Sequence, residues 1–435
     1  AVGFALTILV GALVLMLPVS AADGQITPFL DALFTAASAS CVTGLVTVST
    51  AVHWSVFGKC VILLLIQIGG LGFMSVAAIA SFVLRRTITL HERMVMSAGL
   101  NLSDGGGIVR LTRRVLFGTF IIEGTGAVLL SCRFVPHYGF PKGITMGVFH
   151  AVSAFCNAGF DLMGTPDDPF QSLIGWAEDP LVNITVMALI VLGGLGFFVW
   201  SDVWDKHSFC RLRLHTKIVL TATAGLLLFG FGWTLLFEWS NPATLGAFDT
   251  PHKLLAAAFE SVTLRTAGFN TIDLGALTGP SQAVSCLLMF IGGSPGSTAG
   301  GIKTVTAAVL VLTAISAFCG RTTVSAFGRT IAPRSIMNAV TLLMAGGVLC
   351  LVGACAIAGI EDAPFHQCLF EAVSAFGTVG VSMGLTPTLA AASRVILIVM
   401  MYMGRVGVLT LGVAVFMRRR EPPRLKYPDA DVFIG

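Results

Sequence analysis

The sequence has few charged residues: Asp, Glu, Lys and Arg make up 11% of its 435 residues, whereas a soluble globular chain carries about 25%. Hydrophobic residues make up 55%, and the mean hydropathy is +0.89. A chain of this composition cannot hide its apolar surface from water, which excludes a cytosolic enzyme, a nucleic-acid-binding protein and a secreted disulfide scaffold. The net charge of +4 is too small to indicate a polyanionic partner.

Metal-binding and disulfide patterns are also lacking. The ten cysteines show no CxxC spacing and most lie in apolar runs, so we interpret them as small hydrophobic residues. The eight histidines show no paired metal-ligand spacing, and no covalent cofactor is expected. The chain begins at Ala1 inside an apolar run without a basic head, which we interpret as a shortened start rather than a signal peptide.

Apolar runs long enough, or nearly so, to cross about 30 Å of hydrocarbon as helices recur along the chain. There are eight, the sixth interrupted by glycine and proline: 2–17, 61–84, 115–131, 181–200, 218–237, 283–291 with 305–318, 339–358 and 395–416. The sequence therefore predicts an all-α polytopic membrane protein.

A motif that begins with phenylalanine and ends with glycine occurs four times. Its copies read FTAASASCVTG (34–44), FHAVSAFCNAG (149–159), FESVTLRTAG (259–268) and FEAVSAFGTVG (370–380), so the third is one residue shorter. The final glycines are 115, 109 and 112 positions apart, and a second glycine motif follows each copy, at 69, 193, 292 and 404. We therefore expect four repeats of span, re-entrant helix and span, in pseudo-fourfold arrangement. They cover 1–84, 85–203, 204–318 and 319–417, followed by a tail over 418–435.

Basic residues gather between the repeats and at the C-terminus. Of the 26 Lys and Arg residues, 18 lie there: Arg85, Arg86, Arg93, Arg110, Arg113, Arg114, Lys206, Arg211, Arg213, Lys217, Arg321, Arg329, Arg334, Arg418, Arg419, Arg420, Arg424 and Lys426. By the positive-inside rule these segments and both termini are cytoplasmic. The short helices then enter the membrane from the outer side.

The glycine loops suit an ion path. Non-helical backbone at membrane depth must be buried in protein or line a water-filled path. A ring of carbonyl oxygens can replace the water shell of a monovalent cation, and glycine permits the positive-φ conformations that turn successive carbonyls the same way. The predicted filter for K+ comprises Val42, Thr43, Gly44, Asn157, Ala158, Gly159, Thr266, Ala267, Gly268, Thr378, Val379 and Gly380. The alternative is that these glycines serve only helix packing.

The fourth loop, GTVGV at 377–381, resembles the TVGYG filter of potassium channels. The strings LIQIGGLGF, FNTID after RTAG, GGSPGSTAGGIKT, SAFGTVGVSMGLTP and LKYPDADVFIG extend the likeness. The chain resembles the Trk/Ktr/HKT cation transporter superfamily over nearly its whole length, most closely the Ktr-type membrane subunits.

This resemblance implies several further properties. In the superfamily, serine in the first loop goes with sodium preference and glycine with potassium, so the four glycines here imply potassium. The resemblance also implies potassium uptake by a homodimer in the cytoplasmic membrane, embedded in lipid. It implies a separate cytosolic nucleotide-binding regulatory ring of RCK type, and it leaves Na+ open as an activating or coupled ion.

The interrupted sixth run is the predicted gate. Glycine and proline break a helix at membrane depth, and in the superfamily the matching stretch forms an intramembrane loop under the filter. Arg405 lies in the middle of the last run, where it costs about 2.5–3.5 kcal/mol unless it faces water. The gate residues are Gly292, Gly293, Ser294, Pro295, Gly296, Ser297, Thr298, Gly300, Gly301, Lys303 and Arg405.

Alternatives remain for the gate residues. The loop could be a passive kink, and Arg405 could form a buried ion pair with Glu260 or Glu371. We otherwise interpret these two glutamates as hydrogen-bonded scaffolding behind the filter. Arg265, beside the shortened third loop, must point away from the ion path.

Other functions are also weighed. The G-x-S-x-G pattern around Ser294 fits a hydrolase nucleophile, but it lacks the preceding strand and a histidine partner. The nearby near-match to a phosphate-binding loop places Lys303 one position too late. A sodium-conducting or weakly selective relative and a passive scaffold are the other candidates. We expect a transporter that performs no covalent chemistry.

Overall fold

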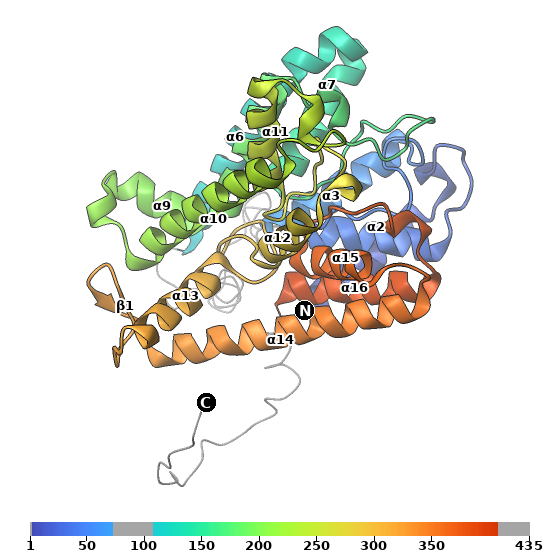
Figure 1. Ribbon diagram of the computed structural model, residues 1–435. Helices are drawn as coiled ribbons and strands as arrows, with labels where there is room; N and C mark the ends of the chain where they lie inside the picture. Colours follow the sequence, from blue (N-terminus) through green and yellow to red (C-terminus); the bar gives the residue numbers. More distant parts are fainter. Residues whose placement is uncertain (1, 73–107, 408–435) are drawn as a thin grey trace.

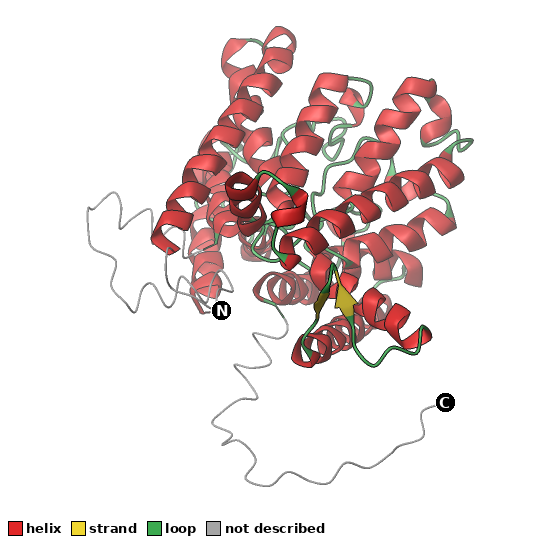
Figure 2. Cartoon of the chain, turned by 90° about the vertical axis from the view of Figure 1, so that its left-hand side faces the viewer, coloured by secondary structure: helices red, strands yellow, loops and turns green. Residues whose placement is uncertain are grey.

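The computed structural model describes residues 2–72 and 108–407, which form a helical protein (Figure 1). Helices dominate the part drawn in colour in Figure 2, with green loops between them, and the all-α fold class is confirmed. The extended elements of this part are β1 (Ser325–Ala326) and β2 (Arg329–Thr330), an antiparallel pair with Ser325 opposite Thr330. The basic residues expected at 85–93 and in the tail 418–435 lie outside the described residues.

Each predicted repeat contributes a first helix, a short helix and a second helix. The α-helices are α1 (Val2–Leu15), α2 (Phe29–Cys41), α3 (Val56–Leu71), α6 (Ile108–Tyr138), α7 (Phe140–Phe155), α8 (Pro180–Leu195), α9 (Phe197–Lys206), α10 (Leu214–Glu238), α11 (Thr250–Thr263), α12 (Gly279–Phe290), α13 (Thr304–Phe318), α14 (Pro333–Ile360), α15 (Phe365–Gly377) and α16 (Ala391–Val406). Single turns of 3₁₀-helix occur at Pro18–Ser20, Ile174–Trp176, Phe209–Arg211, Leu245–Ala247, Leu274–Ala276 and Thr386–Thr388.

Local sequence explains where several helices begin. The Asp179 carboxylate caps α8 by accepting hydrogen bonds from the N–H groups of Leu181 (3.0 Å) and Val182 (3.2 Å). The Ser55 hydroxyl caps α3 by accepting from the N–H of Gly58 at 3.2 Å. Proline occupies the first turn of α7, α8, α11, α12 and α14, where its missing N–H is not needed.

The helices pack in a closed cycle. In every repeat the short helix packs against the first helix, as α2 does on α1 and α7 on α6. Between repeats, the second helix packs against the next short helix: α3 on α7, α8 on α11, α12 on α15 and α16 on α2. The last of these contacts joins the final repeat to the first. An ion pair reinforces it, since Arg394 Nη1 of α16 lies 2.7 Å from Asp31 Oδ1 of α2.

The short helices form the core. The phenylalanine that opens each repeated motif is at most 3% exposed, in all four cases: Phe34, Phe149, Phe259 and Phe370. In contrast, the long helix α14 exposes large apolar side chains such as Met344, Val348 and Leu351. Apolar side chains facing outward are expected of helices whose surroundings are lipid.

The predicted spans differ in length and continuity. By length and composition, three described helices can cross a membrane: 112–138 within α6, α10 and α14. A fourth crosses if the bent pair α8 and α9 counts as one span. The helices α1, α3 and α13 are apolar but shorter. The described part of the chain therefore does not show eight long helices, and residues 73–84 of the second predicted run and 408–416 of the last lie outside the described residues.

The fourth apolar run corrects the sequence prediction of a single span over 181–200. It consists of two helices, α8 and α9, which meet at a bend of 92°. The residue between them, Gly196, has a φ of +93°, a conformation that ends a helix and that glycine adopts without steric cost. Gly72 and Gly407, which follow α3 and α16, also have positive φ, +80° and +89°. The second glycine motif therefore ends a helix in several repeats, not only in the predicted sixth run.

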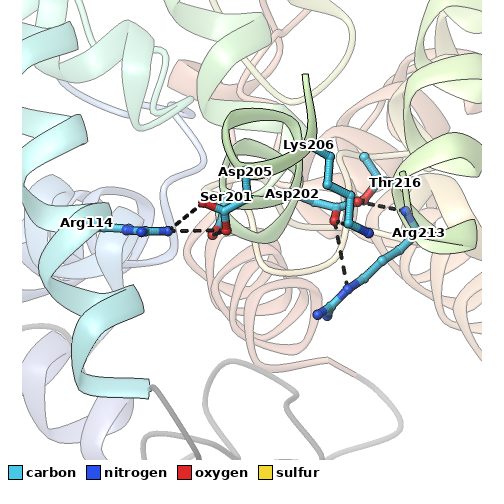
Figure 3. Close-up of polar contacts among 7 residues, drawn as sticks. All are labelled: Arg114, Ser201, Asp202, Asp205, Lys206, Arg213 and Thr216. Carbon is cyan, nitrogen blue, oxygen red and sulfur yellow. Dashed lines mark hydrogen bonds and ion pairs between the residues drawn. The ribbon is translucent and has the colours of Figure 1, made fainter. Parts of the chain in front are cut away.

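Polar contacts hold α9 beyond this bend (Figure 3). The Asp202 carboxylate accepts hydrogen bonds from the backbone N–H of Arg213 at 2.8 Å and from the hydroxyl of Thr216 at 2.7 Å. Asp205 pairs with Arg114 of α6 at 3.1 Å. These contacts tie α9 to the first turns of α6 and to the start of α10.

Candidate ion-conduction site

The four short helices end in the same backbone conformation. Just beyond each helix one residue adopts positive φ, which is uncommon outside glycine: Val42 (+59°), Asn157 (+58°), Thr266 (+69°) and Thr378 (+51°). Two residues later comes the motif glycine, with φ of +96° at Gly44, +68° at Gly159, +87° at Gly268 and +93° at Gly380. A conformation this unusual, repeated four times at the predicted filter, indicates one shared structural role.

The four glycines surround one point. A Cβ built on Gly44 would lie 3.1 Å from the Cα of Gly159, and one on Gly159 would lie 2.7 Å from the Cα of Gly268. The corresponding distances are 3.5 Å from Gly268 to Gly380 and 2.8 Å from Gly380 back to Gly44. The predicted convergence of the four loops is therefore seen in the structure, and the glycines form a ring.

Carbonyl oxygens face the positions where side chains would be. The Cβ of Gly44 would lie 2.5 Å from the carbonyl oxygen of Ala158, and that of Gly268 would lie 2.6 Å from the oxygen of Val379. The carbonyls of Ala267 and Thr43 stand in the same relation to Gly159 and Gly380. These contacts are too short for any side chain, so the ring requires glycine at all four positions.

Hydroxyl groups near the ends of the short helices hold the loops, a feature that the sequence analysis missed. The Ser374 hydroxyl donates to the carbonyl oxygen of Val381 at 2.6 Å and accepts from the N–H of Gly380 at 3.2 Å. Related bonds run from the N–H of Gly44 to Ser38, from Ser153 to Phe160 and from Thr263 to Phe269. A serine or threonine five or six residues before each motif glycine was the available signal.

The shortened third loop is accommodated by one tighter turn. In repeats 1, 2 and 4 the residue before the glycine donates its N–H to the carbonyl five residues earlier, as Val379 does to Ser374. In repeat 3, Ala267 donates to Thr263, four residues earlier. Gly268 therefore still reaches the ring. The Arg265 side chain donates to the carbonyl of Gly292 (3.2 Å) and to the hydroxyl of Thr304 (2.8 Å), so it turns toward the loop between α12 and α13. That it points away from an ion path stays a prediction.

A cavity of about 240 Å³ lies over one side of the ring. Its lining includes the four ring glycines and residues that follow them, such as Leu45, Asp161, Asn270 and Ser382. Burial raises the pKa of Asp161 to about 6, although hydrogen bonds from the Met163 N–H and the Ser172 hydroxyl lower it. We call this cavity the vestibule.

The loop between α12 and α13 lies against the other side of the filter. A Cβ on Gly292 would lie 3.2 Å from Thr266, and one on Gly301 would lie 3.2 Å from Gly377. These contacts involve residues that precede the ring glycines, whereas the vestibule is lined by residues that follow them. The broken sixth run therefore lies on the side of the glycine ring opposite the vestibule.

Hydrogen bonds hold this loop to the second repeat. The N–H groups of Ser294 and Thr298 donate to the carbonyls of Gly194 (3.0 Å) and Gly193 (3.2 Å) at the end of α8. The Thr298 hydroxyl donates to the carbonyl of Phe155, at the end of α7. Within the loop, Lys303 Nζ donates to the carbonyl of Ala299 at 2.7 Å.

Arg405 joins the loop to the first repeat. Its guanidinium donates to the carbonyl of Thr298 in the loop and to the carbonyls of Gly69 and Gly70 at the end of α3, the last at 3.3 Å. The alternative of an ion pair with Glu260 or Glu371 is therefore not seen. Glu371 instead accepts hydrogen bonds from Ser382, Thr386 and the Met383 N–H, as scaffolding would.

Glycine packing explains the second motif. A Cβ on Gly69, Gly193 or Gly404 would collide with a carbonyl oxygen at the end of a short helix, that of Ser40, Phe155 or Phe376 respectively. These glycines let each second helix approach the short helix of its own repeat. The packing interpretation thus applies to the second motif, whereas the first motif forms the ring.

The hydrolase interpretation of Ser294 finds no support. In residues 2–72 and 108–407 its buried hydroxyl has no hydrogen-bond partner, so no described base is positioned to activate it. The same part of the chain holds no group of three or more His, Cys, Asp or Glu side chains that could bind a metal ion.

A helical fold in which four short helices end in glycine loops that meet at one point is typical of a membrane transport protein. The family model described as "TrkH: Cation transport protein" matches residues 8–421, and the chain belongs to this family. It is therefore a transport protein rather than an enzyme.

Similar proteins cover nearly the whole chain. It is 42% identical to the Ktr system potassium uptake protein B of Bacillus subtilis, over 100% of this chain and 96% of that protein. It is 40% identical to the potassium/sodium uptake protein NtpJ of Enterococcus hirae, over the same shares. The crystal structure of the potassium transporter TrkH from Vibrio parahaemolyticus has the same fold, with a TM-score of 0.73 and 16% identity over 95% of this chain and 83% of that one.

Proposed function

We propose that this protein conducts K+ into the cell through the glycine ring. The observation that carries the proposal is the closed ring of Gly44, Gly159, Gly268 and Gly380, with carbonyl oxygens directed at each of its members. Neutral carbonyl dipoles bind a dehydrated alkali cation and repel an anion. The names of the two relatives described above, which take up potassium or potassium and sodium, support the same cargo.

In this proposal the vestibule faces outward, and the twelve predicted filter residues supply the ion-binding backbone. The loop 292–301 with Lys303 and Arg405 is the gate. The vestibule carboxylate of Asp161 raises the local concentration of cations. The four repeats carry the boundaries given above, and both termini lie in the cytoplasm of a cell whose cytoplasmic membrane holds the protein.

The proposed assembly is a homodimer that docks on a separate cytosolic ring of nucleotide-binding subunits. The word "system" in the name of the Bacillus subtilis relative supports the existence of a partner. The proposed docking surface consists of the basic segments between the repeats, including Lys206 at the end of α9 and Arg213 directly before α10. Na+ is an activating or coupled ion in this scheme.

The test is the flux of K+ and Na+ into liposomes that contain the purified chain. We expect K+ flux well above Na+ flux. Gly268→Ser should abolish this preference, since its side chain would lie within 2.6 Å of the Val379 carbonyl. Gly225→Ser is the matched control, because nothing lies within 4 Å of its Cβ. Equal K+ and Na+ flux in the unchanged chain would favour the weakly selective alternative, and no flux in either the unchanged chain or Arg405→Ala, which should open the gate, would refute the proposal.

A further inference from the structure

The buried carboxylate of Glu260 has no partner. Glu260 lies on the short helix α11 and is 1% exposed, yet neither carboxylate oxygen accepts a hydrogen bond from any group in the described part of the chain. Within residues 2–72 and 108–407, the charged group that acts on Glu260 is Glu238, which is also negative. The oxygens of Glu238 are themselves occupied, by Asn241, Thr244 and Thr278.

Repeats 2 and 4 show how this position can be satisfied, whereas in repeat 1 it is Thr35, a neutral residue whose buried hydroxyl also has no partner among the described residues. Glu260 directly follows the motif phenylalanine, as His150 and Glu371 do in repeats 2 and 4. His150 Nε2 accepts a hydrogen bond from the N–H of Leu162, and Glu371 accepts one from the N–H of Met383. Both donors lie three residues after the ring glycine. Glu371 gains two further donors from nearby hydroxyl groups.

In repeat 3 the matching loop positions are also unsatisfied. Asn270 and Thr271 lie two and three residues after Gly268, where repeat 4 has Ser382 and Met383. The side-chain oxygens of Asn270 and Thr271 are buried and have no hydrogen-bond partner among the described residues. Because repeat 3 corresponds to repeat 4, we expect these groups to face the same region, behind the third loop. That region then contains four oxygens without donors: two of a carboxylate, one of an amide and one of a hydroxyl.

A buried carboxylate without donors must be neutralised, either by a proton or by a bound cation, because desolvating its charge costs several kcal/mol. Oxygen-only ligands suit a hard cation. One carboxylate among neutral oxygens balances a single positive charge, whereas divalent sites carry several carboxylates. Asn270 also lines the vestibule, so a site that includes it would be open to ions from that cavity.

We propose that Glu260, Asn270 and Thr271 form a monovalent-cation site beside the vestibule, behind the filter and outside the conduction path. A bound ion would neutralise the carboxylate and brace the third loop from behind. The loop would then be held as Glu371 holds the fourth. This inference rests on the proposed function in one respect, namely that cations enter the vestibule.

The experiment measures equilibrium binding of radioactive Na+ to the full purified chain, with choline replacing Na+ to keep the ionic strength constant. Binding of Na+ by the unchanged chain should exceed that of Glu260→Gln by one site per chain. Glu371→Gln is the matched control, a buried carboxyl with its own donors, and it should keep the extra site. Asn270→Ala should weaken that site at least tenfold, and it provides a test if Glu260→Gln does not fold.

Two results would overturn this inference. One is equal Na+ binding in Glu260→Gln and the unchanged chain. The other is an infrared difference spectrum between these two proteins that contains a protonated carboxyl band at saturating Na+, because a proton would then be the neutralising ion. The proposed function is tested separately, by the flux of K+ into liposomes. K+ flux without an extra Na+ site refutes only the cation site, and the extra site without flux refutes only the proposed function.

Discussion

Replacing Arg405 by alanine tests whether its contacts hold the gate closed. The guanidinium bridges the loop, at the Thr298 carbonyl, to the end of α3, at the carbonyls of Gly69 and Gly70. A hydrogen bond to a charged group contributes about 1.5–3 kcal/mol. Opening the loop away from α3 must break the bonds on at least one side of this bridge.

The expected magnitude follows from those bonds. If the closed conformation alone contains the bridge, its loss removes about 3 kcal/mol of preference for that conformation. A factor of ten corresponds to about 1.4 kcal/mol, so the ratio of open to closed protein should rise roughly 100-fold. In Arg405→Ala we expect K+ flux into liposomes to increase without any regulatory partner, with the increase limited by the initial open fraction.

Arg405→Lys provides the graded control. A lysine keeps the charge but offers a single ammonium instead of a planar fork, so it cannot span both sides of the bridge equally well. Its flux should lie between those of the unchanged chain and Arg405→Ala. If Arg405→Ala, present in equal folded amounts, conducts within a factor of two of the unchanged chain, the bridge does not set the gate.

Two further predictions concern packing and charge. Gly193→Ala places a methyl group against the Phe155 carbonyl, so it should lower the thermal unfolding midpoint or abolish flux. Gly225→Ala, whose methyl group would lie in open space, should leave both unchanged. Equal stability of the two variants would contradict the packing argument. Because the pKa of Asp161 is about 6, its carboxylate is charged above that pH and neutral below it. K+ flux at subsaturating K+ should therefore fall about two- to fivefold as the external pH drops from 7.5 to 5, in line with roughly 1 kcal/mol for a nearby charge, and Asp161→Asn should remove this pH dependence.

Much of the architecture could be predicted because it depends on residue type. Positive φ and close backbone approach both demand glycine, so the two glycine motifs mark the ring and the helix ends. Low charge and long apolar runs indicate the membrane. The bend at Gly196 could not be predicted from the GGLG string at 193–196, because glycine there can serve either to pack two helices or to end one. In the structure Gly193 does the first and Gly196 the second.

Contacts to backbone atoms explain most of what the sequence did not reveal. Arg405 was expected to face a pore or to pair with a carboxylate, yet its partners are main-chain carbonyls, which every residue carries. The isolation of Glu260 was equally hidden, because it depends on which donors are missing around it. Glu260 and Glu371 each directly follow the motif phenylalanine in the sequence, and the difference between them lies in the residues after Gly268 and Gly380.

The contact between α16 and α2, with its Arg394–Asp31 ion pair, makes the first and last parts of the chain neighbours. The fourth glycine of the ring and the helix that carries Arg405 both belong to the last repeat, so the ring is complete only after nearly the whole described chain has been made. Under the proposed function, an unfinished chain would therefore contain neither a closed ring nor a continuous path for ions. The loop between α12 and α13 precedes the last repeat in the chain and would already be present when α16 docks on α2.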